Sequence, residues 1–333
     1  MHATTTSTES KRIPNGEHTA MARTGRLACR APFDLQRSLD FLSGFTPMHG
    51  EQAIARNVLT KAFLIGGRAI AVRAFQANSD DGIEAPVLRY GLTASRPVDA
   101  EAEAETVRRL AHFLSADEDM APFYELAGRD PAMVPVVRRL RGLHHVKFPT
   151  PFEAACWGVL NQRIGLHAAR AMKDAIVRRW GDSVTVDGAP FWAFPNASAV
   201  ARDGEAAIAA LIGNPRKARA VHAVSRAFAA VGDDFFRDAT DPELIAWLEA
   251  IHGVGDFTTG FVMYRGLGRF RSVPMSPKFT LAAERVYGRR LSRADLEALF
   301  AQYGRWGGHW AVYVWTSTFP ATIPPRDTPR PPS

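Results

Sequence analysis

The stretch Ile251-His252-Gly253-Val254-Gly255-Asp256-Phe257 joins two segments that both have helical periodicity. Two glycines that bracket one apolar residue permit a tight turn with positive φ and the close approach of another backbone. Such a turn presents the free N–H groups of the next helix to an anion, and a DNA phosphate suits that position. We therefore expect Gly253 and Gly255 to form the anion contact and Val254 to anchor the turn in the core. The competing interpretation is an ordinary glycine-capped connection between two helices.

Around this turn the chain divides into an α+β part and a helical part. Alternation at residues 61–65 and 68–75, with Gly66-Gly67 between them, predicts the two strands of a hairpin. Thr150-Pro151-Phe152-Glu153 has the residues of a capping box and is expected to open a long helix. We expect a disordered basic tail at residues 1–23 and a small α+β domain at 24–115. A helical body follows at 116–319, with its helix-hairpin-helix near 243–267, and a Pro-rich tail ends the chain at 320–333.

Composition favours a nucleic-acid partner. The 333 residues carry a formal net charge of +7, with a pI near 9.7, and 46% of them are hydrophobic. Cys29 and Cys156 lie far apart and the histidines lack zinc-site spacing, so we expect no cofactor and no metal centre. Because no apolar run reaches the roughly 18 residues of a membrane span, we expect a cytoplasmic monomer, associated with the nucleoid if the source is a bacterium.

The turn and several further motifs resemble the helix-hairpin-helix DNA glycosylase superfamily, and within it bacterial DNA-3-methyladenine glycosylase II. The further motifs are Leu160–Ile164, Pro215–Arg219, Ser272–Pro274 followed by Val286–Gly288, and Trp306–Trp315. Each motif is loose alone, but their order and spacing are specific, and the resemblance covers about residues 30–318. It implies a mainly α fold, a two-lobed helical body with a small N-terminal α+β domain and a DNA groove between the lobes.

The resemblance also implies a function: a monofunctional enzyme of base-excision repair that flips alkylated, 3-methyladenine-type bases from double-stranded DNA and hydrolyses their N-glycosidic bonds. Gln162 and Arg163 fall where the family inserts a side chain into the vacated stack. Phe257 falls where alkylation enzymes have a tryptophan and bifunctional enzymes a lysine nucleophile, which favours stacking on the base and excludes a Schiff base there. The further candidates for the base pocket, with plain helix packing as their alternative, are Phe261, Trp306 and Trp310. The family often holds a monovalent cation at the hairpin.

One position departs from the family pattern. The catalytic aspartate should follow Val273-Pro274 after one intervening residue, and this chain has Ser276 there, with no acidic residue between 272 and 283. An aspartate stabilises the positive charge that develops on the sugar, whereas a serine hydroxyl offers only a dipole.

Three alternatives follow from Ser276. In the first alternative, the protein excises only bases that already carry positive charge. In the second, another carboxylate stabilises the sugar, and Asp256 is the nearest in sequence. The third alternative is a catalytically weak or inactive protein that binds damaged or distorted DNA. Lys278 is expected to pair with a phosphate near the pocket or to lie on the helix surface.

Overall fold

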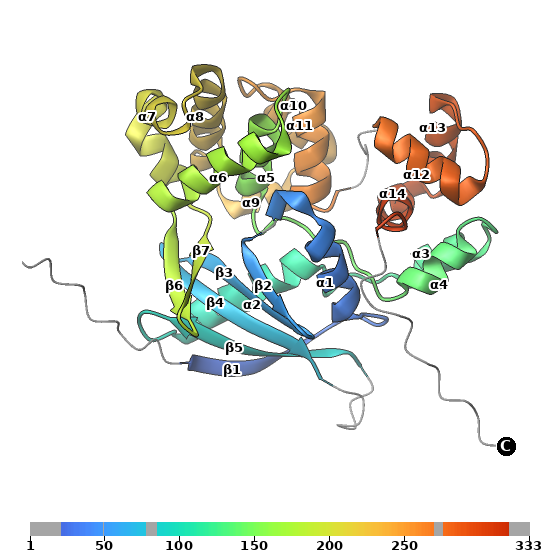
Figure 1. Ribbon diagram of the computed structural model, residues 1–333, viewed down its shortest axis with the longest axis horizontal. Coiled ribbons are helices and arrows are strands. Elements are labelled where there is room, and N and C mark those ends of the chain that lie inside the picture. Colours follow the sequence, from blue (N-terminus) through green and yellow to red (C-terminus); the bar gives the residue numbers. More distant parts are fainter. Residues whose placement is uncertain (1–20, 49, 78–84, 270–275, 320–333) are drawn as a thin grey trace, which may run out of the picture.

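A computed structural model describes residues 21–48, 50–77, 85–269 and 276–319. An antiparallel sheet lies on one side of the molecule and two groups of helices lie beside it (Figure 1). The sheet has five strands in the order β1-β5-β4-β3-β2. The strands are β1 (Met21–Ala28), β2 (Gln52–Ala55), β3 (Val58–Ile65), β4 (Arg68–Gln76) and β5 (Val87–Ala94).

The predicted strand pair is confirmed as β3 and β4. They pair in register from Ile65 opposite Arg68 to Val58 opposite Phe75. Gly66 and Gly67 have φ of 56° and 77°, as a two-residue hairpin turn requires. Strand β1 begins at Met21, so residues 21–23, which were predicted to belong to the tail, are part of the sheet. The rest of that tail and the Pro-rich tail lie outside the described residues.

The helices form two lobes, as predicted. The first lobe contains α5 (Pro151–Leu160), α6 (Leu166–Trp180), α7 (Ala197–Ile212), α8 (Pro215–Ala229), α9 (Asp233–Asp238), α10 (Asp241–Glu249) and α11 (Asp256–Phe261). The second contains α3 (Ala121–Gly128), α4 (Val134–Leu140), α12 (Pro277–Tyr287), α13 (Arg293–Gln302) and α14 (Gly307–Thr316). Helix α1 (Leu35–Gly44) precedes β2, and α2 (Ala100–Leu114) packs on β1, β3 and β4. The second lobe is therefore built from segments that lie far apart in the chain.

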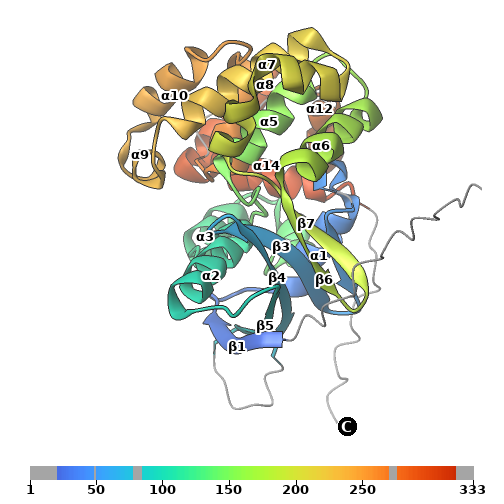
Figure 2. The same ribbon diagram turned by 90° about the vertical axis from the view of Figure 1, so that its left-hand side faces the viewer.

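A strand pair inside the first lobe corrects the prediction of a purely helical body. Strands β6 (Asp182–Val186) and β7 (Ala189–Ala193) form an antiparallel hairpin between α6 and α7. It extends along the N-terminal sheet, where the Asp182 carboxylate accepts the Ala69 N–H at 2.7 Å (Figure 2). Small apolar side chains of the hairpin and of β3 and β4 form a separate buried cluster beneath it. The hairpin thus fastens the helical lobe to the sheet.

Helix α5 begins where the capping-box residues predicted. The Thr150 hydroxyl accepts the Glu153 N–H at 3.1 Å. The Glu153 side chain is buried and accepts a hydrogen bond from Lys173 Nζ at 2.7 Å instead of completing the box. In the described part of the chain, no helix has the length and apolar character that crossing a membrane requires.

Candidate nucleic-acid interface and base site

The predicted hairpin lies between α10 and α11, and its two glycines have different conformations. Gly253 has a φ of +87°, and a Cβ atom there would lie 2.5 Å from Ala220 Cβ, so glycine is required. Gly255 has a φ of −122° and open space around it, so the expectation of positive φ is wrong at this residue. Val254 is buried, as an anchor must be, and its N–H donates to Ile251 O at 3.0 Å. The turn ends at Gly255, the N-cap of α11.

The loop after α5 is hydrogen-bonded to this hairpin. Gln162 Nε2 donates to Gly253 O at 2.9 Å and to Thr258 Oγ1 at 3.0 Å. Lys217 Nζ, from the first turn of α8, donates to Val159 O at 2.8 Å and to Gln162 O at 2.7 Å. The Gln162 amide therefore links the loop to the hairpin, so of the two residues predicted for insertion into the duplex, Gln162 and Arg163, it is Gln162 whose side chain is engaged within the protein.

Arg163 stands at the tip of the same loop. It is exposed and has a φ of +54°, a conformation that side-chain-bearing residues adopt at a cost. A cavity of about 270 Å³ lies beside it, lined partly by basic side chains: Arg163, Arg216, Lys217 and His252. Burial, together with the Arg216 charge, lowers the pKa of Lys217. The loop, the hairpin and the start of α8 thus form one unit with a basic surface, which we call the loop–hairpin unit.

Aromatic rings extend from α11 toward α1. Phe257 is 48% exposed and stacks on Phe261, with ring centroids 6.2 Å apart. Phe261 contacts the edge of Phe148, and Phe148 contacts Phe45. The ring of Phe45 stacks on Phe41 at the end of α1. Among the described residues, Phe257 is therefore the exposed outer end of an otherwise packed row of rings.

Sequence reasoning missed the inner members of this row. Phe41 and Phe45 come from α1 and the residue that follows it, and Phe148 precedes α5, so three segments contribute to it. Phe319 adds a further ring that stacks on Phe41 at 5.8 Å. The signal in the sequence was only the four-residue spacing of Phe41 and Phe45, which is also typical of helix packing.

The structure does not bring Trp306 and Trp310 together with Phe257. Trp310 is fully buried in the second lobe, where its indole N–H donates to the Tyr287 hydroxyl at 2.9 Å. Trp306 is also buried and packs on His309, with ring centroids 4.8 Å apart. Trp306 and Trp310 thus pack between helices, which was the alternative to a place in the base pocket.

Ser276 is the N-cap of α12. Its Oγ accepts the Phe279 N–H at 3.2 Å, and the residue is exposed. Lys278 is exposed in the first turn of the same helix. Asp256 is exposed as the first residue of α11. Residues 270–275, which include Val273-Pro274, lie outside the described residues.

Comparisons with known proteins agree with the resemblance seen in the sequence. No family model matches the chain. It is 26% identical to the DNA-3-methyladenine glycosylase of Bacillus subtilis over 272 residues, which are 79% of this chain and 86% of that protein. A 3-methyladenine DNA glycosylase structure from Archaeoglobus fulgidus aligns with a TM-score of 0.72 at 20% identity, covering 89% of this chain and 99% of that one.

A second solved structure is the Clostridium acetobutylicum 8-oxoguanine glycosylase/lyase in complex with double-stranded DNA. It aligns with a TM-score of 0.61 at 15% identity and covers 86% of this chain and 91% of that one. The chain therefore has the helix-hairpin-helix glycosylase fold, and the predicted fold class, mainly helical with a small N-terminal sheet, is confirmed.

Proposed function

We propose that this protein is a monofunctional DNA glycosylase of base-excision repair that flips and excises alkylated, 3-methyladenine-type bases from duplex DNA. The observation that carries the proposal is the loop–hairpin unit, in which one set of hydrogen bonds holds Arg163 at an exposed tip beside the anion-binding turn. The similarity to a DNA-3-methyladenine glycosylase over 79% of the chain supports the substrate class.

In this proposal the loop–hairpin unit binds the duplex. The N–H groups at the start of α11 hold a phosphate, and the basic side chains beside Arg163 add a salt-dependent attraction. Arg163 fills the gap that the flipped nucleotide leaves, since Gln162 is already bonded to the hairpin. Asp256 opposes phosphate binding, because its carboxylate stands in the first turn of α11.

The flipped base stacks on the exposed ring of Phe257. A cationic base gains most from this contact, because the face of an aromatic ring attracts positive charge. Water then forms a bond to the sugar C1′ and releases a proton to solvent, while the bond between C1′ and the base nitrogen breaks and the base leaves with the electron pair. Phe257 has no amine for Schiff-base formation, which supports hydrolysis without strand cleavage.

Ser276 is expected to make excision selective for cationic bases over neutral ones. Its hydroxyl caps α12 and supplies no negative charge to the sugar. A base that already carries positive charge leaves as a neutral molecule and needs less electrostatic help than a neutral base. We propose that such lesions are the substrates.

The hairpin is also the proposed position of a monovalent cation, which the family resemblance implies. Gly253 O already accepts from Gln162 and Ile251 O from Val254, and each carbonyl keeps a second lone pair that fits such an ion. In the described residues no group of histidine, cysteine or acidic side chains could hold a metal ion. The protein would act as a monomer on cytoplasmic DNA.

Base release tests the proposal. Wild type is incubated with methylated duplex DNA, and the free base is separated and quantified. We expect release of 3-methyladenine, reduced at least tenfold in Phe257→Ala. Tight binding of a duplex with an abasic-site analogue, together with no release by wild type, would instead favour a non-enzymatic damage-binding protein.

A further inference from the structure

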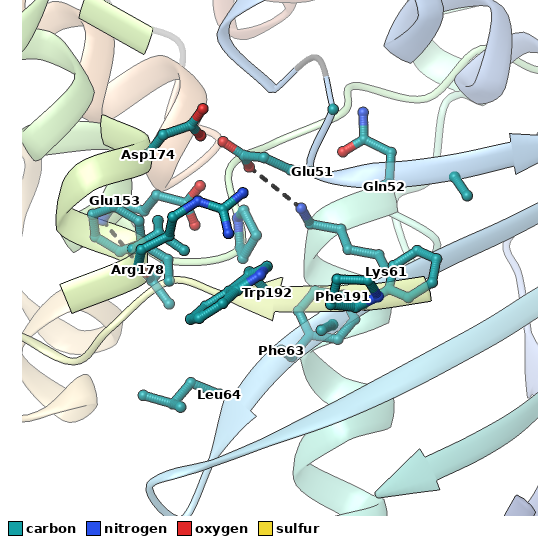
Figure 3. Close-up of a pocket in the computed structure, with 18 of the residues that line it drawn as sticks. Glu51, Gln52, Lys61, Phe63, Leu64, Glu153, Asp174, Arg178, Phe191 and Trp192 are labelled. Atoms are coloured by element: carbon teal, nitrogen blue, oxygen red, sulfur yellow. Dashed lines mark hydrogen bonds and ion pairs between the residues drawn. The ribbon is translucent and has the colours of Figure 1, made fainter. Parts of the chain in front are cut away.

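A cavity of about 320 Å³ lies between the N-terminal sheet and the first helical lobe, and charged side chains in its lining and beneath it are held by neighbouring groups (Figure 3). Lys61 and Lys173 both pair with Glu51. The Arg178 guanidinium lies 5.2 Å from the centre of the Trp192 ring. These contacts join β3 and β7 to α6, so the basic side chains here have a structural role.

Arg163, at the tip of the loop–hairpin unit, has no such contact. Its side chain is exposed, and within the described ranges it makes no hydrogen bond, ion pair or ring contact. The cavity beside it is lined by Arg216, Lys217 and His252 and by no carboxylate. The neighbouring charges are therefore positive, and the guanidinium stays available to an outside group that carries hydrogen-bond acceptors.

The backbone holds Arg163 at the tip of the loop in an unfavourable conformation. Its φ of +54° lies in the left-handed region, which glycine and asparagine adopt far more readily than arginine does. The loop keeps this shape because Gln162 Nε2 donates to Gly253 O at 2.9 Å and Lys217 Nζ donates to Gln162 O at 2.7 Å. A strained residue that the surrounding contacts hold in place indicates a side chain with a function.

Under the proposed function, on which this step rests, the Arg163 guanidinium enters the gap that the flipped nucleotide leaves. A guanidinium carries N–H donors and no acceptor, so stacking between bases would leave its donors unsatisfied. The Watson–Crick edge of the base opposite the lesion faces the same gap, because its own partner has left. The acceptors on that edge are therefore within reach of Arg163.

The four bases differ in the acceptors that this edge offers. Cytosine has two adjacent acceptors, N3 and O2, which match the planar fork of N–H groups on a guanidinium. In thymine an N–H group separates the two carbonyl oxygens. Adenine has a single ring nitrogen beside a donor, and guanine has one carbonyl oxygen beside two donors. Cytosine is therefore the base with which Arg163 can form a bidentate contact.

We propose that Arg163 recognises cytosine opposite the lesion and is thereby a specificity-determining residue. Guanine is the normal partner of cytosine, so alkylated guanines are the favoured substrates within the class of alkylated bases. A guanine methylated at N7 carries a positive charge on its ring, so it also meets the requirement that Ser276 imposes. Lesions opposite thymine, such as 3-methyladenine, remain substrates but gain less from Arg163.

The test is binding of the full chain to four duplexes that each contain a tetrahydrofuran abasic-site analogue. They differ only in the base opposite the analogue: cytosine, thymine, adenine or guanine. We expect the tightest binding opposite cytosine, on the order of tenfold tighter than opposite adenine, which is the contribution of one bidentate pair. Arg163→Lys keeps the charge without the fork and should lose most of this preference. Arg163→Leu fills the gap without donors and should bind all four duplexes alike.

Arg216→Met is the matched control, since it removes a neighbouring positive charge and should weaken binding to all four duplexes by the same factor. Equal wild-type affinities, or tightest binding opposite another base, would overturn the proposal. A cytosine preference that Arg163→Leu retains would also overturn it, because another group would then read the base.

Base release from methylated duplex DNA, measured separately, distinguishes this proposal from the proposed function. Release by wild type without any opposite-base preference would remove only the role of Arg163. A cytosine preference that disappears in Arg163→Leu, without any release of base, would support the role of Arg163 and contradict excision.

Discussion

At the scale of single residues, Ser276 performs one of the two tasks that an aspartate at its position would perform. Its oxygen caps α12 through the Phe279 N–H, but it brings no charge. An aspartate also caps a helix well, so Ser276→Asp should fold normally. It should raise the excision rate at least about tenfold, since losing a positioned electrostatic group often costs 10²–10³ in rate.

Ser276→Asn is the matched control for this change. Asparagine has the shape and capping ability of aspartate without its charge, so its excision rate should stay near that of wild type. Single-turnover release of hypoxanthine, a neutral base, is the sensitive measurement. Equal rates for the Asp and Asn variants would mean that the α12 N-cap does not face the sugar.

The two hairpin glycines form a second comparison at this scale. Gly253→Ala places a Cβ 2.5 Å from Ala220 Cβ at a φ of +87°, so it should lower the free energy of unfolding by about 1–3 kcal/mol and weaken duplex binding. Gly255→Ala meets open space in extended backbone, so it should cost less, about 0.5–1 kcal/mol, because alanine is a poorer N-cap than glycine. Denaturant unfolding and duplex affinity at matched salt are measured for both. Equal losses in the two variants would contradict the assignment of strain to Gly253.

At the scale of elements, Lys217 connects α8 to the end of α5. Its ammonium satisfies Val159 O and Gln162 O, and Gln162 then bonds the hairpin. We expect Lys217→Met to abolish the preference for an abasic-site duplex over an intact duplex, because the loop tip loses its support. Arg163→Ala should have the same effect, because it removes the side chain that is proposed to fill the gap in the duplex. Lys217→Arg should restore part of this preference, since a guanidinium keeps the positive charge and has N–H donors for both carbonyl groups.

Arg216→Met controls for charge. Arg216 is exposed beside Lys217, so this variant removes one positive charge and leaves the loop contacts in place. It should weaken binding to both duplexes alike and reduce the salt dependence by about one phosphate contact. If Arg216→Met and Lys217→Met behave identically, Lys217 acts only through its charge.

The elements differ in how well the sequence predicts them. The hairpin turn, the β3–β4 pair and the Thr150 cap follow from local residue preferences, and the structure has all three. The β6–β7 hairpin was missed because its strands are five residues each and gain stability from the distant N-terminal sheet. The role of Gln162 was missed for the same reason: its partners lie 91 and 96 residues away.

At the scale of the whole molecule, two histidines, His112, which is half-buried, and His145, which is buried, predict how stability depends on pH. Burial, followed by the Lys147 charge, lowers the pKa of His112 to about 3, and burial and Arg265 lower that of His145 well below its usual value. Both remain neutral in the folded protein while the unfolded chain binds protons below about pH 6.5. The unfolding free energy should therefore fall from pH 6.5 to 5, by about 1.4 kcal/mol per pH unit for each group.

Unfolding in denaturant between pH 7.5 and 5 checks this dependence. His112→Gln should reduce the slope by about half, because one of the two neutral histidines is removed. His167→Gln changes an exposed histidine and should leave the slope unchanged. A flat profile in wild type would show that neither imidazole ring resists protonation.

The fold could be predicted from the order and spacing of the motifs, whereas the candidate site could be predicted only in part. The fold class and the two lobes were predicted from motifs spread over nearly the whole chain. The aromatic row beside Phe257 needs α1, the segment before α5 and α11 to meet, and no local pattern specifies that meeting. The sequence predicted that Ser276 takes the place of the aspartate, but it did not predict the hydrogen bond by which Ser276 Oγ caps α12 at the Phe279 N–H.

The central claim is that this protein excises cationic bases although Ser276, at the N-cap of α12, replaces an aspartate. The most direct measurement is single-turnover release of 3-methyladenine and of hypoxanthine by wild type, from duplexes that are otherwise identical. We predict measurable release of 3-methyladenine, and release of hypoxanthine slower by on the order of 10²-fold, the scale of one missing electrostatic group. Release of both bases at similar rates, or of neither, would contradict the account.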